Sequence, residues 1–589
     1  MVHRFAVPAA LALAAVLSAQ PGFFRLKDIK PGMHAIGRTI FSGNKIDDFQ
    51  VEILGVIENI GPKESLILAR LSGGPLEHTG VMQGMSGSPV YIDGKLVGAV
   101  AMAFPFSKDP IAAIRPIEDM VTAPGMELAA SPPRIPAVAL ADRDLTRPFA
   151  RPASVGMGES RMVDIATPLS FGGFSQAALD AFAPQLRAIG LEPRQSIANG
   201  ARIEPGMGNP ADLKPGSMIS MELMSGDLSM NADCTVTYID GPRVYACGHR
   251  FLDVGPTAMP FARSEVIALL PNVNTSFKIS AAKEWMGVIS EDRNTAVAGE
   301  LGKRAPLAPL TMSVWRGGKS IENYQAQMVN DPLLSPLLLQ MAVYSAIDAT
   351  ERTVGASSLR VTGEVEFQNA PAPVRLDNIF SADNGSALQA SLAAAIPLAY
   401  VMQSGFNALK LKKMDLRIEA YDQKKQLEID GLSLSRREVR PGETIQLQVL
   451  LTGENGAEMV RKLEYEVPIG AAPGPLYFTA ADANTTNLTD FRAVLTSTPH
   501  TVGQLIGTVN NLHPNNKAYV RVWRPDPSFQ LEGAEMPDPP ASVALILAGS
   551  QSSSAGITQT RNSKIGEMEI DGGDVVISGV KTIQVEVKE

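Results

Sequence analysis

The sequence predicts a mainly β protein in which two β-barrel regions and a β-sandwich are joined by helical linkers. Residues 23–120 and 206–320 consist of short apolar-rich runs separated by turn residues, a pattern typical of small barrels or sandwiches. From residue 414 to about 523 the chain again alternates apolar and polar residues, as the strands of an immunoglobulin-like sandwich do. Glycine and proline are frequent (51 and 43 residues) and aromatic residues make up only 6%, which also suits a chain rich in strands and turns.

These patterns divide the chain into seven regions. Helical spacing of apolar residues predicts helices over 175–189, 331–350 and 387–409, and a short helix inserted in the sandwich near 486–509. The expected regions are 1–19 (signal peptide), 22–125 (first barrel half), 126–205 (linker with a helix), 206–320 (second barrel half), 321–410 (helical or mixed connector), 411–530 (β-sandwich) and 531–589 (flexible tail with a terminal strand).

Residues 1–19 have the organisation of a secretory signal. A basic start, Met1–Arg4, precedes an apolar run that ends near Leu17, and small residues place the expected cleavage near Ala19. This run is too short for a stable membrane anchor, and no later run reaches the roughly 20 apolar residues of a membrane helix. We therefore expect an exported protein, periplasmic, extracellular or at the cell surface, with no membrane span after the signal. An uncleaved signal that acts as an anchor is the alternative.

Composition excludes several classes of function. The chain of 589 residues is 45% hydrophobic, enough for several cores, and its net charge of −9 gives no electrostatic footprint for a nucleic-acid partner. No cluster of histidine and cysteine has metal-ligand spacing, and no phosphate-binding glycine loop occurs. We expect neither a metal nor a cofactor.

The most informative motif is a serine enclosed by glycines, in Gly84-Met85-Ser86-Gly87-Ser88-Pro89. Glycine tolerates backbone angles that other residues avoid, so such a turn can leave the hydroxyl of Ser86 unobstructed. Two apolar strands follow around Asp93-Gly94, a dipeptide favoured in hairpin turns. The loop can present a nucleophile and direct backbone N–H groups at an oxyanion. An ordinary glycine-serine turn between strands is the alternative.

This motif resembles the serine loop of chymotrypsin-like peptidases, and Gln83–Pro89 is most similar to the sporulation stage IV B (SpoIVB) serine peptidase family. The resemblance implies that Ser86 is the nucleophile and that the N–H groups of Gly84 and Ser86 form the oxyanion hole. It implies a protein or peptide substrate. Because peptidases of this family cut membrane-associated partners in signalling, it also suggests an envelope-associated partner.

The second barrel half supplies the predicted base. Cys234–Asp240 and Arg243–His249 are two strands about a Gly241-Pro242 turn, and Gly248-His249 resembles the family motif that carries the catalytic histidine. With Tyr238 opposite Arg243, Cys234 and Cys247 would face each other across this hairpin. In an exported protein they predict a disulfide, although buried free thiols are the alternative.

The serine half precedes the histidine half here, whereas the family has the reverse order. The resemblance therefore implies two chymotrypsin-like β-barrel halves in permuted order, which geometry-defined catalytic groups tolerate. The family's aspartate before the serine loop is missing. Asp292 follows His249 at a separation similar to that in chymotrypsin-like barrels and is the favoured acid. Asp253, or a serine-histidine pair without an acid, remains open.

The other five histidines are weaker candidates for the base. His3 would be removed with the signal, and His78, eight positions before Ser86, is the second choice. Ordinary surface or packing roles are expected for the remaining three: His34, His500 and His513. The sequence thus predicts an exported serine endopeptidase with Ser86, His249 and Asp292 as its catalytic residues. A catalytically inactive protease-like binding or assembly module of the cell envelope is the alternative. A structural β-rich surface protein, in which the serine turn is accidental, is a further one.

Overall fold

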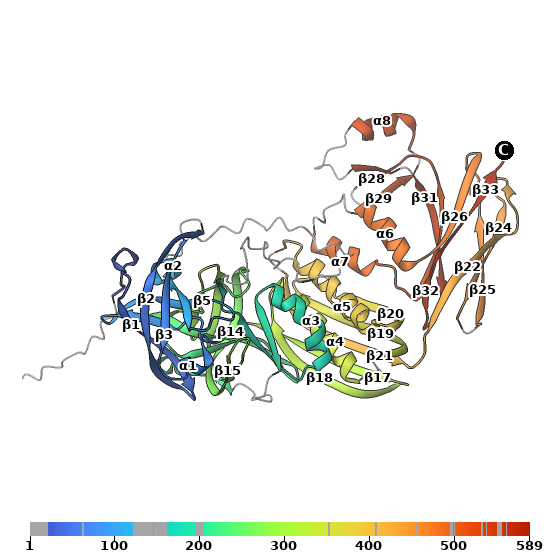
Figure 1. Ribbon diagram of the computed structural model, residues 1–589. Helices are drawn as coiled ribbons and strands as arrows, with labels where there is room; N and C mark the ends of the chain where they lie inside the picture. The colour runs from blue at the N-terminus through green and yellow to red at the C-terminus, as the bar shows by residue number, and fades with distance from the viewer. Residues whose placement is uncertain are drawn as a thin grey trace, which may run out of the picture.

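The computed structural model describes the chain from residue 22 to its end, with gaps (Figure 1). The predicted signal peptide lies outside the described residues. No helix within the described part of the chain is long and apolar enough to cross a membrane. The residues left undescribed are 1–21, 62–63, 122–144, 146–161, 196–203, 351–353, 407–408, 455, 495–498, 500, 532–533, 538, 550–556 and 561.

The N-terminal region forms a closed six-stranded barrel with its own apolar core. Its elements are β1 (His34–Ser42), β2 (Lys45–Gly61), β3 (Glu64–Ser72), α1 (Leu76–Thr79), β4 (Pro89–Ile92), β5 (Lys95–Ala103), β6 (Ile111–Pro116) and α2 (Ile117–Val121). The strands pair in the order β4-β1-β2-β3-β6-β5, and pairing of β5 with β4 closes the ring. Along β1 buried and exposed residues alternate, because one face of each strand points into the barrel. The short β7 (Val163–Asp164) pairs with β5.

A second barrel is built in the same way from residues 218–301. Its strands are β11 (Met218–Gly226), β12 (Ser229–Asp240), β13 (Arg243–Ala246), β14 (Gly255–Leu270), β15 (Phe277–Arg293) and β16 (Ala296–Leu301). They pair in the order β11-β14-β15-β16-β13-β12, and β12 pairs back with β11 to complete the ring. Both predicted barrel regions are therefore confirmed as β structure. Figure 1 shows the two barrels side by side at one end of the molecule.

The sheet of the second barrel continues beyond the ring and carries helices on one face. The additional elements are β8 (Thr167–Gly172), α3 (Gln176–Ala188), β9 (Leu191–Gln195), β10 (Glu204–Met207), β17 (Leu307–Arg316), β18 (Lys319–Val329), α4 (Leu334–Thr350), β19 (Val354–Gln368), β20 (Val374–Asn384), α5 (Ser386–Met402) and β21 (Lys410–Tyr421). Strand β8 pairs with β12 and β18 pairs with β11, so strands extend the ring on both sides. The three helices pack against the same apolar core as the barrel (Figure 1).

Side chains cap the first turns of two of the predicted helices. The hydroxyl of Ser175 accepts the N–H of Ala178 at the start of α3, and the carboxylate of Asp331 accepts two N–H groups before α4. The expected helical connector at 321–410 also contains strands, because β18, β19 and β20 join the sheet of the second barrel.

The C-terminal region is a β-sandwich that includes most of the expected tail. Its elements are β22 (Gln426–Leu434), β23 (Glu438–Val439), β24 (Thr444–Thr452), β25 (Glu458–Glu466), β26 (Gly474–Asp482), α6 (Ala483–Val494), α7 (Val502–Asn510), β27 (Lys517–Arg524), β28 (Ser528–Leu531), β29 (Ala534–Pro537), α8 (Ala541–Gly549), β30 (Ile557–Thr560), β31 (Ser563–Asp571), β32 (Val576–Ser578) and β33 (Val580–Val587). Sheets β25-β24-β22-β32 and β23-β33-β26-β27-β31 share one core. Strands β31 and β33 belong to the sandwich because Ile570, Val585 and Val587 are buried in that core.

The two barrels meet where the serine turn contacts the second barrel. Gly87 lies so close to the second barrel that a Cβ atom on it would fall 1.9 Å from the carbonyl oxygen of Thr235 and 2.6 Å from the nitrogen of Cys247. Both obstructing atoms are backbone atoms, which cannot rotate away. This approach requires glycine at position 87.

We expect Gly87→Ala to lower the unfolding temperature of the barrels much more than Gly94→Ala does. Both glycines have a positive φ (93° and 74°), so both variants carry the same kind of backbone strain. Nothing lies within 4 Å of a Cβ at Gly94. The difference in stability between the two variants therefore measures the clash at Gly87, for which overpacking predicts about 2 kcal/mol. Differential scanning calorimetry of the full chain measures it. Equal unfolding temperatures for the two variants would show that the barrels can move apart at this contact without loss of stability.

Candidate active site

The serine turn connects α1 to β4. Gly84 and Gly87 both adopt left-handed φ values, 88° and 93°, so the motif needs glycine at these positions. The side chain of Ser86 is completely buried, and its hydroxyl has no hydrogen-bond partner among the described residues. A buried hydroxyl without a partner is costly, and such groups are concentrated at functional sites.

The backbone N–H groups of this turn fall into two sets. Those of the first set donate to carbonyl oxygens at 2.8–3.1 Å: Met85 to Met82, Gly87 to Val100 and Ser88 to Met85. The N–H groups of Gly84 and Ser86 have no acceptor in the part of the chain that the structure describes. Uncommitted donors on and beside a nucleophile are what an oxyanion hole requires.

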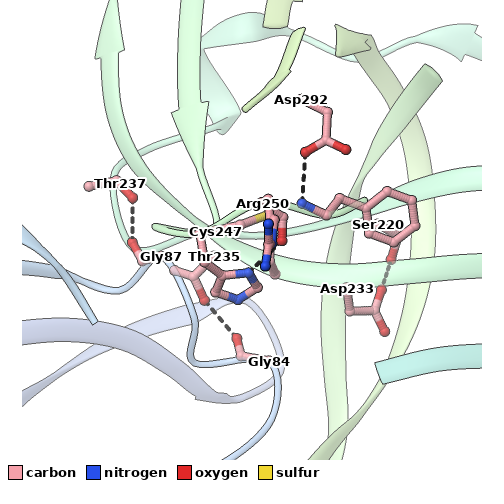
Figure 2. The surroundings of a disulfide bond; sticks show 12 residues. Gly84, Gly87, Ser220, Asp233, Thr235, Thr237, Cys247, Arg250 and Asp292 are labelled. Atoms are coloured by element: carbon pink, nitrogen blue, oxygen red, sulfur yellow. Dashed lines mark hydrogen bonds between the residues drawn. A yellow bond between two sulfur atoms is a disulfide. The ribbon is translucent and has the colours of Figure 1, made fainter. Parts of the chain in front are cut away.

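Two threonines of β12 hold the serine turn. The N–H of Thr235 donates to the carbonyl of Ser86 at 2.8 Å, and its hydroxyl donates to the carbonyl of Gly84 at 2.8 Å. The hydroxyl of Thr237 donates to the carbonyl of Gly87 at 2.7 Å. Figure 2 shows these threonines, two positions apart on one face of the strand, directed at the turn. Neither threonine was among the predicted site residues, because their only signal in the sequence is their alternation beside Cys234.

The histidine turn follows β13 directly. Cys247 and Gly248 have positive φ values of 69° and 71°, which reverse the chain before His249. A disulfide joins Cys247 to Cys234, the neighbour of Thr235, with 5.2 Å between their Cα atoms, so the predicted disulfide is confirmed. It lies beside the site in Figure 2.

The hairpin register that led to this disulfide was wrong. Arg243 pairs with Asp240, and Tyr238 pairs with Tyr245 instead of Arg243. A β-bulge between Val236 and Tyr238 shifts the register by one residue, so that the N–H of Cys247 reaches the carbonyl of Thr235 at 3.1 Å.

The imidazole of His249 is fixed by a backbone group. Its Nδ1 lies 2.7 Å from the carbonyl oxygen of Arg250. Because a carbonyl oxygen can only accept, Nδ1 carries the proton and Nε2 carries the lone pair in the neutral ring. This is the tautomer that a general base needs. The ring is 98% buried, since its exposed fraction is 2%.

The serine and histidine turns meet at Val100. The N–H of Gly87 donates to the carbonyl of Val100 at 2.8 Å, and a Cβ on Gly248 would lie 3.2 Å from the same oxygen. Gly87 and Gly248, the sequence neighbours of Ser86 and His249, therefore both lie near this carbonyl oxygen. Because the side chains of Ser86 and His249 are enclosed, a ligand can reach them only if the surroundings open.

Asp292 holds the loop that follows His249. Its carboxylate accepts the N–H groups of Phe251 and Leu252 at 2.7 Å each and that of Val254 at 3.3 Å. Figure 2 shows its carboxylate directed at this backbone. Burial raises the pKa of Asp292 to about 6, although the backbone hydrogen bonds act in the opposite direction. The hydrogen bonds described for Asp292 reach the backbone of the histidine loop rather than the imidazole.

The remaining predicted candidates lie apart from this arrangement. His78 is exposed on α1 and His34 is exposed on β1. Asp253 is half exposed, with its carboxylate 3.6 Å from the guanidinium of Arg250. His513 binds Glu567 in the sandwich. His3 and His500 lie outside the described residues.

A buried cation lies next to the serine turn. The Nζ of Lys278 donates to the hydroxyl of Thr39 at 2.7 Å, and burial lowers its pKa to about 7. Asp233, which accepts the hydroxyls of Ser220 and Ser280, opposes that shift. The stem of Lys278 would lie 3.3 Å from a Cβ on Gly84. Within the described ranges, no group of three or more histidine, cysteine, aspartate or glutamate side chains could hold a metal ion.

Titration of Asp292 should control the stability of the histidine loop. In the closed loop its pKa is about 6, whereas an opened loop returns it to the ordinary value of 3.8. Between these values the closed form holds a proton that the open form releases, so opening becomes easier as pH rises. We expect amide protection of residues 251–254 to fall by about thirtyfold from pH 4 to pH 6.

Hydrogen exchange read by mass spectrometry, corrected for intrinsic exchange rates, measures this protection. In Asp292→Asn, which keeps a carbonyl acceptor but cannot titrate, protection should be independent of pH. A flat profile in the wild type would contradict the coupling.

Comparison with known proteins identifies the first barrel. Residues 23–112 match the family model of the SpoIVB peptidase S55, which confirms the resemblance carried by the serine motif. No curated protein and no solved structure matches the chain. The matched segment contains Ser86 and the strands around it but ends before the second barrel. The role of His249 and the permuted order of the two halves therefore stay predictions.

Proposed function

Because residues 23–112 match the SpoIVB peptidase S55 family, we propose that this chain is an exported serine endopeptidase that cleaves a protein substrate through an acyl-enzyme. One observation carries the proposal. The serine of the family motif lies in a turn whose two uncommitted N–H groups, those of Gly84 and Ser86, suit an oxyanion hole.

In the proposed reaction Ser86 Oγ attacks the substrate carbonyl while Nε2 of His249 takes its proton. The C–N bond then breaks, and the imidazolium returns the proton to the leaving amine. Water, deprotonated by the same nitrogen, attacks the ester carbonyl and releases the acid and Ser86. The hydrogen bond from Nδ1 to the carbonyl of Arg250 supports the required tautomer throughout.

We assign Asp292 a positioning role in place of the acid of a triad. Its three backbone hydrogen bonds to residues 251–254 fix the loop that carries the Arg250 carbonyl, and that carbonyl fixes the imidazole. In a triad one acid orients the histidine. Here the Arg250 carbonyl orients the imidazole, and the Asp292 carboxylate holds the loop that carries this carbonyl. Asp253, exposed and near Arg250, has no comparable set of contacts.

Export is the second part of the proposal. The Cys234–Cys247 disulfide fits an oxidising compartment, as the signal-like N-terminus does. The extended sheet and the sandwich offer surfaces for a protein substrate or an envelope-associated partner.

Reaction of the full chain with a small fluorophosphonate tests the nucleophile. We expect covalent labelling of the wild type at Ser86, identified by peptide mass spectrometry, and no labelling of Ser86→Ala. Ser88→Ala is the matched control, because Ser88 is equally buried and its hydroxyl also has no partner among the described residues. It should react like the wild type. His249→Ala should react at least about 100-fold more slowly than the wild type, the usual loss for a general base.

Equal labelling of wild type and Ser86→Ala would exclude Ser86 as the nucleophile. A folded wild type that resists the reagent would favour the inactive binding module instead.

A further inference from the structure

A cavity of about 280 Å³ adjoins the serine turn on the side of Gln83. From its position and charge we propose that it is the specificity pocket of the peptidase, and that Arg194 selects a glutamate or aspartate side chain there. The inference rests on the proposed function and names its substrate class. The cavity is lined by Pro168, Ser170, Pro193, Arg194, Gln195, Phe277, Lys278, Ile279 and Ser280.

Backbone contacts place the cavity beside the oxyanion donors. The N–H of Gln83 donates to the carbonyl of Ser276 at 2.9 Å, and the N–H of Lys278 donates back to Gln83 at 3.3 Å. The stem of Lys278 also lies beside the next residue, Gly84, 3.3 Å from where a Cβ on that glycine would be. The wall formed by the start of β15 is therefore continuous with the residue whose N–H we assign to the oxyanion hole.

This position determines which substrate residue can enter. The attacked carbonyl carbon is bonded directly to the Cα of the residue before the scissile bond. With its oxygen at Gly84 and Ser86, the side chain of that residue is the one within closest reach of a cavity that adjoins Gly84. Pockets for drug-sized ligands measure about 300–1,000 Å³, so a cavity just below that range suits a single side chain.

The guanidinium of Arg194 is held in place without being neutralised. Its Nε and Nη2 donate to the side-chain oxygen of Gln83 at 3.3 and 3.2 Å, and its plane lies over the ring of Phe277, 3.6 Å from the centroid. A guanidinium has five N–H donors, so three remain. The ion pairs among the described residues do not include Arg194, and the carboxylate of Glu192 acts on it only through longer-range electrostatics. Its sequence neighbour Glu192 is already paired with Arg187 at 2.9 Å.

Two other polar side chains of the cavity, those of Lys278 and Ser280, already donate hydrogen bonds to other residues. Lys278 lines it with its stem while its Nζ donates to Thr39. The hydroxyl of Ser280 donates to Asp233 at 2.6 Å, behind the wall. The titratable residues that line the cavity, Arg194 and Lys278, are both basic. A planar guanidinium with free donors matches a carboxylate, which it can bind through two parallel hydrogen bonds.

Two peptidyl diphenyl phosphonates, identical except for a glutamate-type or a glutamine-type side chain before the phosphorus, test the pocket on the full chain. Ser86 Oγ bonds to phosphorus and displaces phenoxide, so labelling does not depend on turnover. We expect the glutamate-type reagent to react about 10 to 100 times faster, the effect of charge-assisted hydrogen bonds. Arg194→Met should bring the ratio of the two rates close to one, and Arg194→Lys should keep part of it.

Arg417→Met is the matched control, since Arg417 also lies over an aromatic ring, that of Trp315 at 4.0 Å, but is paired with Glu419 on β21, away from the cavity. Its ratio should equal that of the wild type. If Arg194→Met slowed both reagents equally and kept the ratio, Arg194 would only support Gln83, and the pocket assignment would be wrong. A wild type that the fluorophosphonate labels but that shows no preference would also overturn it. Absence of labelling by all three reagents would contradict the peptidase function itself.

Discussion

The hydrogen bonds between Thr235 and the serine turn are the interaction on which the rest of the site depends. Turns of the first barrel make the contact with strands of the second: the backbone of Gly43 pairs with Val266, and that of Gln83 bonds to Ser276 and Lys278. Thr235 uses its N–H and its hydroxyl on the carbonyls of Ser86 and Gly84, and its own carbonyl accepts the N–H of Cys247. One residue of β12 thereby binds the turn that carries the serine and the turn that leads to the histidine.

The histidine turn is held from two further directions. The disulfide ties Cys247 to Cys234, which precedes Thr235, so the covalent and hydrogen-bonded attachments act on the same short stretch of β12. From the other side of the barrel, Asp292 on β15 accepts the N–H groups of the loop after His249. Small residues complete the contact. Gly87 and Gly248 permit approaches to backbone atoms at which any side chain would collide or crowd.

Local patterns in the sequence sufficed for the barrels, the helices, the serine turn and the disulfide, because glycine turns, helix caps and hairpins depend on neighbouring residues. These local patterns could not predict interactions between residues that are far apart in the sequence. The Thr235 contacts join residues about 150 positions apart, and the bulge at Val236 altered a register that a regular hairpin pattern had suggested. The contacts between Asp292 and the backbone of residues 251–254 could not be predicted from the sequence either. A buried aspartate at that spacing suits a triad acid, but three backbone N–H groups occupy it.

Orientation of the imidazole by a carbonyl has a consequence for the electrostatics of the site. The Arg250 carbonyl contributes a dipole, whereas a triad carboxylate contributes a full charge, so in the proposed reaction the imidazolium would be stabilised less. Burial acts in the other direction on the oxyanion. In an enclosed site of low dielectric, the N–H groups of Gly84 and Ser86 interact more strongly with a developing negative charge than they would in water. The buried Lys278, whose stem lies beside Gly84, adds positive potential on that side whenever its amine is protonated. In the proposed mechanism, electrostatic stabilisation therefore acts mainly on the oxyanion and less on the imidazolium.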